Sequence, residues 1–203
     1  MSTAEDRAPI IVADAGPLIR LAAAGLLDSL RGLNRRIVLV DRVEDEVIGD
    51  RSKPFAAEVA AWIDAMGPAI ERAQTAIGIG VATLKARQRT AEEDAVLKGA
   101  LRDSGELAMR EFLDRWQPGE TQSAVVVYED KKVPPLMLAA TYPLTLMTTR
   151  TFVRLAERWG INVGAVAALE AIAGRYDLKP ALIAEINPEE PEDLRQLPRP
   201  YLP

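Results

Sequence analysis

Residues 9–22 of the chain read PIIVADAGPLIRLA. The apolar run at 9–13 predicts a fully buried strand, because strands that are covered on both faces are apolar throughout. Asp14 ends that run, and from 18 to 30 apolar residues recur at helical spacing. The opening of the chain therefore predicts a strand, a turn and a helix, with an aspartate at the point where the strand ends.

The same alternation continues along the chain. Further buried strands are expected at 37–40, 124–128 and 144–148, with a short one beginning at 69–70. Helices are expected at 54–66, 91–101, 106–116, 150–159, 163–173 and 180–186, with one or two turns at 134–140. Short apolar strands that alternate with helices favour an α/β fold, with a mostly parallel sheet and helices on both faces.

Two local motifs carry expectations of their own. Asp41 follows a predicted strand and is expected to be a helix N-cap, with Glu44 three residues later as its capping-box partner. Residues 77–81 (IGIGV) are typical of a glycine loop. They lack the third glycine of a dinucleotide-binding fingerprint, so that function is not predicted.

The composition limits the chemistry. The chain has 203 residues and a net charge of −5, with no cysteine and no histidine, which predicts one domain. The two absences exclude disulfides, thiol nucleophiles, Ser-His-Asp triads and ordinary zinc sites. A metal ion would need oxygen ligands, which favours Mg²⁺, Mn²⁺ or Ca²⁺.

The ends of the chain suggest where the protein resides. No run of about 18 apolar residues is present, and the N-terminus has no secretory pattern. No membrane association and a cytoplasmic location are therefore expected. Residues 187–203 (NPEEPEDLRQLPRPYLP) contain five prolines and a net negative charge, which predicts an extended or disordered tail.

In a parallel α/β sheet, ligands bind at the carboxyl ends of the strands. Asp14, Glu129 and Asp130 end predicted strands. Glu46 lies on the helix after the second strand and Glu106 in the first turn of its helix, and both are expected to face the same edge. Converging carboxylates repel one another unless they are protonated or share a cation. A divalent metal held by them would lower the pKa of its bound water and stabilise charge on a phosphoryl oxygen. Phosphodiester hydrolysis is the reaction that most needs both effects.

The order of these motifs resembles that of the PIN-domain family, which includes the VapC-type toxin ribonucleases. The similar segments cover most of residues 10–175: IIVADAGPLIRLAAAGLLDSL (10–30), IVLVDRVEDEVIGD (37–50), DSGELAM (103–109), VVVYEDKK (125–132) and LTLMTTRTFVRLAERWGIN (144–162). The chain departs from the family pattern at the fourth acidic position, where Glu129 precedes Asp130. It also departs at the final turn, where Thr148-Thr149 replaces Gly-Thr.

The resemblance implies a three-layer α/β/α sandwich over residues 1–186, with an insertion at about 77–102, followed by the tail. It implies a metal-dependent endoribonuclease in which Mg²⁺ or Mn²⁺ is bound by Asp14, Glu46, Glu106 and either Asp130 or Glu129. Thr149 is expected to position a water or a carboxylate, and Lys131 and Lys132 to bind RNA. Basic residues also cluster at 35–36, 85–89 and 150–158.

The partners that the resemblance implies are an RNA substrate, an antitoxin protein and a second copy of the chain. Two alternative functions are also considered. One is a PIN-like module of weak catalytic activity that binds RNA or protein. The other is a phosphatase or phosphotransferase with Asp14 as nucleophile, which is disfavoured because Gly16 stands where such enzymes carry a second aspartate.

Overall fold

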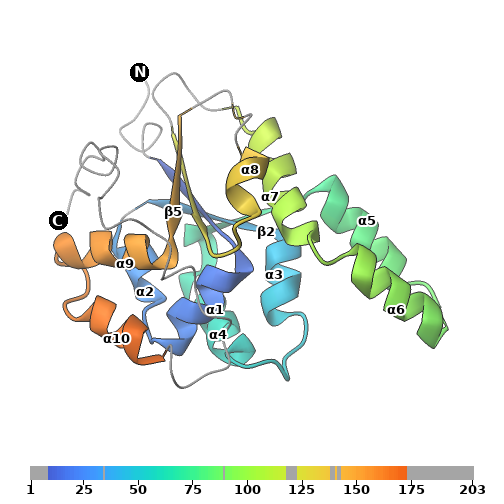
Figure 1. Ribbon diagram of the computed structural model, residues 1–203, viewed down its shortest axis with the longest axis horizontal. Coiled ribbons are helices and arrows are strands. Elements are labelled where there is room, and N and C mark those ends of the chain that lie inside the picture. Colours follow the sequence, from blue (N-terminus) through green and yellow to red (C-terminus); the bar gives the residue numbers. More distant parts are fainter. Residues whose placement is uncertain are drawn as a thin grey trace.

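The computed structural model describes residues 9–33, 35–88, 90–117, 123–137, 140 and 143–172 (Figure 1). The strands are β1 (Ile10–Ala13), β2 (Arg36–Val40), β3 (Ile70–Ala73), β4 (Ala124–Tyr128) and β5 (Leu144–Thr148). The helices are α1 (Ala15–Ala23), α2 (Asp28–Gly32), α3 (Asp41–Ile48), α4 (Ala56–Met66), α5 (Ala76–Lys85), α6 (Ala91–Ala100), α7 (Ser104–Arg115), α8 (Val133–Met137), α9 (Thr149–Arg158) and α10 (Ala165–Ile172). A short 3₁₀ turn (Gly67–Ala69) precedes β3.

The strands form one sheet in the order β3-β2-β1-β4-β5, and every described pairing is parallel. At its centre Ile11 pairs with Ile37 on one side and with Val125 on the other. All four residues of β1 are buried, as the apolar sequence predicts for a strand that is covered on both faces. The α/β prediction is confirmed.

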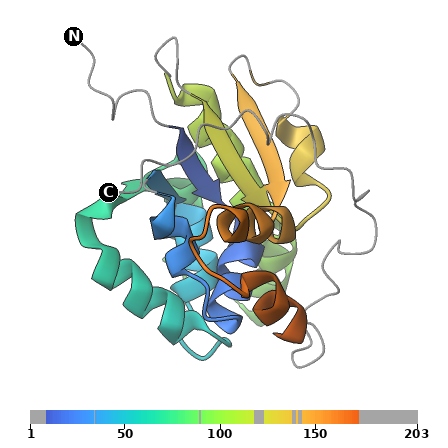
Figure 2. The ribbon, with the colours of Figure 1, turned by 90° about the vertical axis from the view of Figure 1, so that its left-hand side faces the viewer.

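The crossovers of the sheet change direction between the neighbouring strands β1 and β4. From β1 the chain moves outward to β2 and β3, whereas from β4 it moves the other way to β5. Right-handed crossovers in opposite directions place helices on opposite faces. Accordingly, α7 and α8 lie on one face, and α1 and α9 on the other (Figures 1 and 2). The carboxyl ends of β1 and β4 therefore border the crevice where ligands bind in open α/β sheets.

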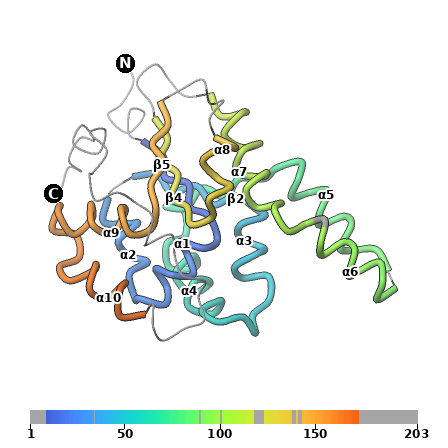
Figure 3. The backbone as a smooth tube through the Cα atoms, viewed as in Figure 1, coloured from blue at the N-terminus to red at the C-terminus, as the bar shows by residue number. Residues whose placement is uncertain are grey.

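Helices α5 and α6 project from the body as an arm (Figure 3). The base of this arm is fixed by two carboxylates. Asp41 of α3 accepts hydrogen bonds from the Thr75 amide (2.9 Å) and the Thr75 hydroxyl (2.8 Å). Glu111 of α7 accepts from the amides of Ala76 (2.8 Å) and Ile77 (2.9 Å). The first turn of α5 thus has its free amides satisfied by acids from the body, which also complement the helix dipole.

Three local predictions are wrong in detail. The apolar pattern at 18–30 forms two helices, because Gly25 adopts a left-handed φ of +67° that ends the first. Residues 77–81 are helical, since Thr75 caps α5 by accepting from the Gly78 amide. Asp41 is the first helical residue and Val40 is the N-cap.

The capping-box expectation fails with that shift. Glu44 forms an ion pair with Arg72 of β3 (3.3 Å) and does not cap the helix. The side chain of Asp41 serves the arm instead. Both acids therefore support contacts between elements, and Asp41 also accepts a hydrogen bond from the Arg42 amide in the first turn of α3 (2.8 Å).

The remaining strand and helix predictions are confirmed to within a few residues where the structure describes them. The helix expected at 180–186 and the tail at 187–203 lie outside the described residues. Within the described ranges, no helix combines the length and the apolar character that crossing a membrane requires.

Candidate carboxylate site

Asp14 stands at the junction of β1 and α1, at the carboxyl edge of the sheet. It is the N-cap of α1, and its Oδ1 accepts a hydrogen bond from the Ala15 amide (2.8 Å). Only 7% of the residue is exposed. The pKa of Asp14 is raised to about 7, chiefly by burial and also by the nearby charges of Glu106, Glu46 and Asp130, which together outweigh the lowering effect of the Ala15 amide.

Glu46 and Glu106 bring two more carboxylates from helices that pack against each other. Glu46 lies on α3, and Glu106 lies in the first turn of α7 and is 8% exposed. The glycine before Glu106 allows a close approach, because a Cβ at Gly105 would lie 3.0 Å from Oε2 of Glu46. Burial raises the pKa of both acids, and the charge of Glu46 raises that of Glu106 further.

A buried arginine, Arg42, fixes the position of these two helices. Its Nε and Nη2 donate to the Ser104 hydroxyl (3.0 and 2.7 Å), and the same hydroxyl donates to the Leu101 carbonyl (2.7 Å). Arg42 also pairs with Asp45 one turn later on α3. Since Arg42 precedes Glu46 by one helical turn and Ser104 precedes Glu106 by two residues, this contact sets the separation of the two acids. The charge of Arg42 also lowers the pKa of Glu46.

The two adjacent acids after β4 have different partners. Glu129 forms a buried ion pair with Arg20 of α1, in which Oε2 lies 2.6 Å from Nε. Gly16 makes room for this side chain, because a Cβ there would lie 3.1 Å from the Cβ and Cγ of Glu129. Burial raises the pKa of Glu129, and Thr149 and Arg20 lower it.

Asp130, in contrast, belongs electrostatically to the acid cluster. Its charge raises the pKa of both Asp14 and Glu106. Its carboxylate accepts a hydrogen bond from the Lys132 amide (2.9 Å), which closes a tight turn after β4. Of the two candidates for the fourth position, Asp130 is therefore the one that shares the electrostatic environment of Asp14.

The other residues expected at the site lie around its rim. Lys131 and Lys132 are exposed. Lys132 donates to Asp103 in the turn before α7 (2.7 Å), and this contact raises the pKa of Lys132. Thr149 is 1% exposed at the start of α9. It lowers the pKa of Glu129, although its hydroxyl makes no well-formed hydrogen bond.

The oxygen donors match the preferences of a hard divalent cation. Asp14, Glu46 and Glu106 all have raised pKa values because burial disfavours their charged forms, and a bound cation would remove that penalty. Over the described ranges, however, no three acidic side chains are close enough to hold one ion together. The oxygen donors of these residues suit a divalent metal ion. Joint binding of one ion by three of them requires the carboxylates to lie closer to one another.

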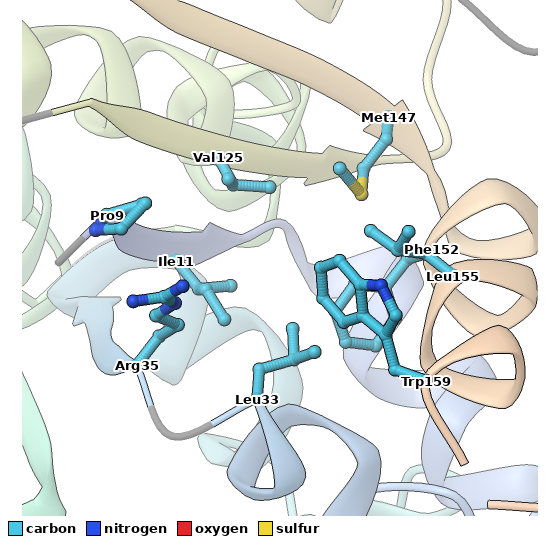
Figure 4. A pocket seen from close by; sticks show the side chains of 9 residues that line it. All are labelled: Pro9, Ile11, Leu33, Arg35, Val125, Met147, Phe152, Leu155 and Trp159. Carbon is cyan, nitrogen blue, oxygen red and sulfur yellow. The ribbon is translucent and has the colours of Figure 1, made fainter. Parts of the chain in front are cut away.

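A separate apolar pocket lies on the face of the sheet that α9 covers (Figure 4). Its wall includes Ile11, Val125 and Trp159, with Arg35 at one end. The volume is about 20 Å³, room for roughly one water molecule. The pocket holds no carboxylate and is a packing gap and not a reaction site.

Sequence reasoning missed Arg20 and Arg42. Both stand in helices that the apolar pattern predicts, where a lone arginine is ordinarily exposed. Their partners, Glu129 and Ser104, are distant in the sequence, and no local signal connects them. Neither pairing could have been predicted without the fold.

The structure thus brings Asp14, Glu46, Glu106 and Asp130 into one electrostatic cluster at the carboxyl edge of the sheet, and directs Glu129 to Arg20. Comparison of the chain with protein-family models, with curated proteins and with solved structures finds no match.

Proposed function

We propose that this protein has a PIN-like fold and is a metal-dependent endoribonuclease that hydrolyses RNA phosphodiester bonds at the carboxylate cluster. The observation that carries the proposal is the mutual effect of four acids, since Glu106, Glu46 and Asp130 all raise the pKa of a buried Asp14. Such a cluster is unfavourable unless a cation shares it. The motif resemblance over residues 10–175 supplies the reaction class.

In this proposal Asp14, Glu46, Glu106 and Asp130 hold Mg²⁺ or Mn²⁺. The bound cation supplies Lewis-acid stabilisation of the phosphoryl oxygens and lowers the pKa of a coordinated water. Asp14 provides the fixed reference point, because its amide donates to the Val127 carbonyl of β4 (3.0 Å) and its carboxylate caps α1. Arg42 and Ser104 maintain the spacing of Glu46 and Glu106.

The residues around the cluster have supporting roles. The Arg20–Glu129 pair positions the turn that carries Asp130. The buried hydroxyl of Thr149 is available to donate to a carboxylate or to a water at the cluster. Lys131 and Lys132 are proposed to contact substrate phosphates. An antitoxin partner and a homodimer stay predictions.

One observation favours a second candidate, a PIN-like module of weak catalytic activity that binds RNA or protein. No three acids of the described part of the chain are close enough to ligate one ion. If the side chains cannot close around a cation, the scaffold would bind without cleaving. The same assay separates the two candidates.

The test is cleavage of a mixed single-stranded RNA pool in Mn²⁺, in Mg²⁺ and in chelator. The wild-type protein is compared with Asp14→Asn and with Asp64→Asn, an exposed aspartate of α4. We expect cleavage that requires metal, is lost in Asp14→Asn and persists in Asp64→Asn. Cleavage that survives Asp14→Asn contradicts the mechanism, and the absence of both cleavage and metal binding supports the binding module.

A further inference from the structure

A groove of about 690 Å³ runs between α3 and the arm, next to the carboxylate cluster. Its described wall consists of Arg42 and Glu46 of α3, Lys53 of the following loop, Lys85 of α5, and residues 94, 95, 97–99, 101 and 102. A second hollow of about 560 Å³ on the α5 side shares Arg42 and Lys85 with it. The arm therefore forms one wall of both hollows, and the body forms the other.

The charge of the groove is opposite to that of the chain. Five basic side chains line it, namely Arg42, Lys53, Lys85, Lys98 and Arg102, against the two acids Glu46 and Asp94. The formal charge of the lining is +3, whereas the whole chain carries −5. Basic side chains gathered in a cleft attract anions over a distance and concentrate them there.

Two of these cations lack an acidic partner. Among the described residues, neither Lys98 nor Arg102 forms an ion pair. Lys85 and Arg42 both pair with Asp45. The positive charge that is available to an incoming anion is therefore that of Lys98 and Arg102.

The groove leads to the acids. Glu46 belongs both to its lining and to the carboxylate cluster, and Lys53 Nζ donates to the Glu46 carbonyl (2.9 Å). Arg102 stands four residues before Glu106 in the turn that leads into α7. An anionic chain lying along Lys98 and Arg102 would reach the cluster at Glu46.

We propose that this groove binds the phosphate backbone of single-stranded RNA and guides the strand to the carboxylates, with Lys98, Arg102 and Lys53 as the phosphate contacts. This inference rests on the proposed nuclease function and adds the path of its substrate. No aromatic side chain is found among the described residues that line the groove. Contacts are therefore made to phosphates without base stacking, and binding tolerates many sequences.

The test measures binding without catalysis. Fluorescence anisotropy of an end-labelled oligouridine is recorded in chelator, so that no metal-dependent cleavage occurs. The variant Lys98→Ala/Arg102→Ala is compared with Arg31→Ala/Arg154→Ala, which removes the same charge from exposed positions on α2 and α9. We expect the groove variant to bind roughly tenfold more weakly and the control variant to bind like the wild type. The slope of the logarithm of the binding constant against the logarithm of the salt concentration should become shallower by about 0.7 for each lost phosphate contact.

The outcomes separate this inference from the proposed function. An equal loss of affinity in both double variants would show that only the net charge of the protein matters, and it would overturn the groove. The absence of oligouridine binding by the wild type would overturn it too. If the wild type cleaves RNA and the groove variant binds and cleaves normally, the groove is refuted. The proposed nuclease function is unaffected by that result. A selective loss of binding in a protein that never cleaves supports the groove and refutes the nuclease. Restored binding in Lys98→Arg/Arg102→Lys, with unchanged circular dichroism in all variants, excludes misfolding as the cause.

Discussion

Arg20 of α1 and Glu129 at the end of β4 form an ion pair that is largely removed from water, with exposed side-chain fractions of 9% and 13% and a Nε–Oε2 distance of 2.6 Å. The pair joins the helix after β1 to the turn after β4, the two strands whose carboxyl ends border the carboxylate cluster. Burial nevertheless raises the pKa of Glu129. The pair therefore orders the site at the cost of burying the Glu129 carboxylate, which Arg20 and Thr149 partly offset.

Removing one member of this pair should destabilise the protein. In Arg20→Met the carboxylate of Glu129 stays buried without its cation, and we expect a loss of about 3 kcal/mol in the free energy of unfolding at pH 8. The loss should shrink as the pH falls, because protonation of Glu129 removes the buried charge. Urea unfolding at several pH values measures this. The double variant Arg20→Met/Glu129→Gln should recover much of the loss, and a loss that does not change with pH would contradict the role of Glu129.

Asp14→Asn should stabilise the metal-free protein above neutral pH. The pKa of Asp14 is about 7 in the folded protein, against an ordinary aspartate pKa of 3.8, so the folded state holds the proton more tightly. This tighter proton binding by Asp14 adds to the free energy of unfolding. The addition is complete below pH 3.8 and is lost as the pH rises through 7. Replacing Asp14 with the neutral cap Asn should add up to about 4 kcal/mol at pH 8 and little at pH 4. Thermal unfolding in chelator across this range is the measurement, with Asp64→Asn expected to change stability at neither pH.

Divalent metal should stabilise the wild-type protein, and more strongly at pH 8 than at pH 5. Ligation requires ionised carboxylates, and Asp14, Glu46 and Glu106 all resist ionisation in the folded protein. At a metal concentration of about 100 times the dissociation constant, the free energy of unfolding rises by about 2.7 kcal/mol. Unfolding in Mn²⁺ and in chelator measures it. A gain of equal size in Asp14→Asn would place the metal elsewhere.

Asp130 and Glu129 should respond differently to substitution. Asp130→Asn removes a proposed ligand and should abolish metal-dependent RNA cleavage while leaving the melting temperature nearly unchanged. Glu129→Gln leaves Arg20 without its charged partner, so it should lower stability and reduce cleavage only in part. Cleavage rates and melting curves of the two variants decide the assignment. The reverse pattern would make Glu129 the ligand.

Two glycines of α5 provide a matched pair for the base of the arm. A Cβ at Gly78 would lie 2.0 Å from the Asp41 carboxylate, whereas one at Gly80 meets no atom within 4 Å. Gly78→Ala should therefore break the hydrogen bonds of Asp41 with Thr75 and cost about 2 kcal/mol. Gly80→Ala should add up to about 1 kcal/mol through helix propensity. Urea unfolding of both variants tests this, and equal effects would show that Asp41 does not anchor the arm.

The sequence predicts the sheet better than the contacts between helices. The runs at 10–13, 37–40 and 124–127 are continuously apolar, a pattern typical of a doubly covered strand, and the structure confirms each as a buried strand segment. The strand expected at 144–148 is also present, although its first three residues are only partly buried. Asp14 could be singled out because such a strand ends directly at it. These signals are local, and they need no knowledge of which segments meet.

The parts that failed depend on partners far along the chain. The first two amides of α5 are satisfied by Glu111, which follows Ala76 by 35 residues. The one local signal for this helix is the N-cap Thr75, and it stands beside two glycines that disfavour a helix. Arg42 and Ser104 are 62 residues apart. The choice between Glu129 and Asp130 depends on Arg20, whose burial cannot be predicted from the pattern of α1 alone. Such contacts become visible only when the fold places the elements side by side.

The attachment of the arm has an evolutionary consequence. The arm contributes Lys85 and Lys98 to the groove, but none of the five acids at the carboxyl edge. Under the proposed function, mutations in α5 and α6 can therefore alter the proposed RNA groove while the proposed metal ligands stay under separate selection. A lineage that carries this scaffold could then change its substrate by remodelling the arm alone, without changing any of the proposed metal ligands.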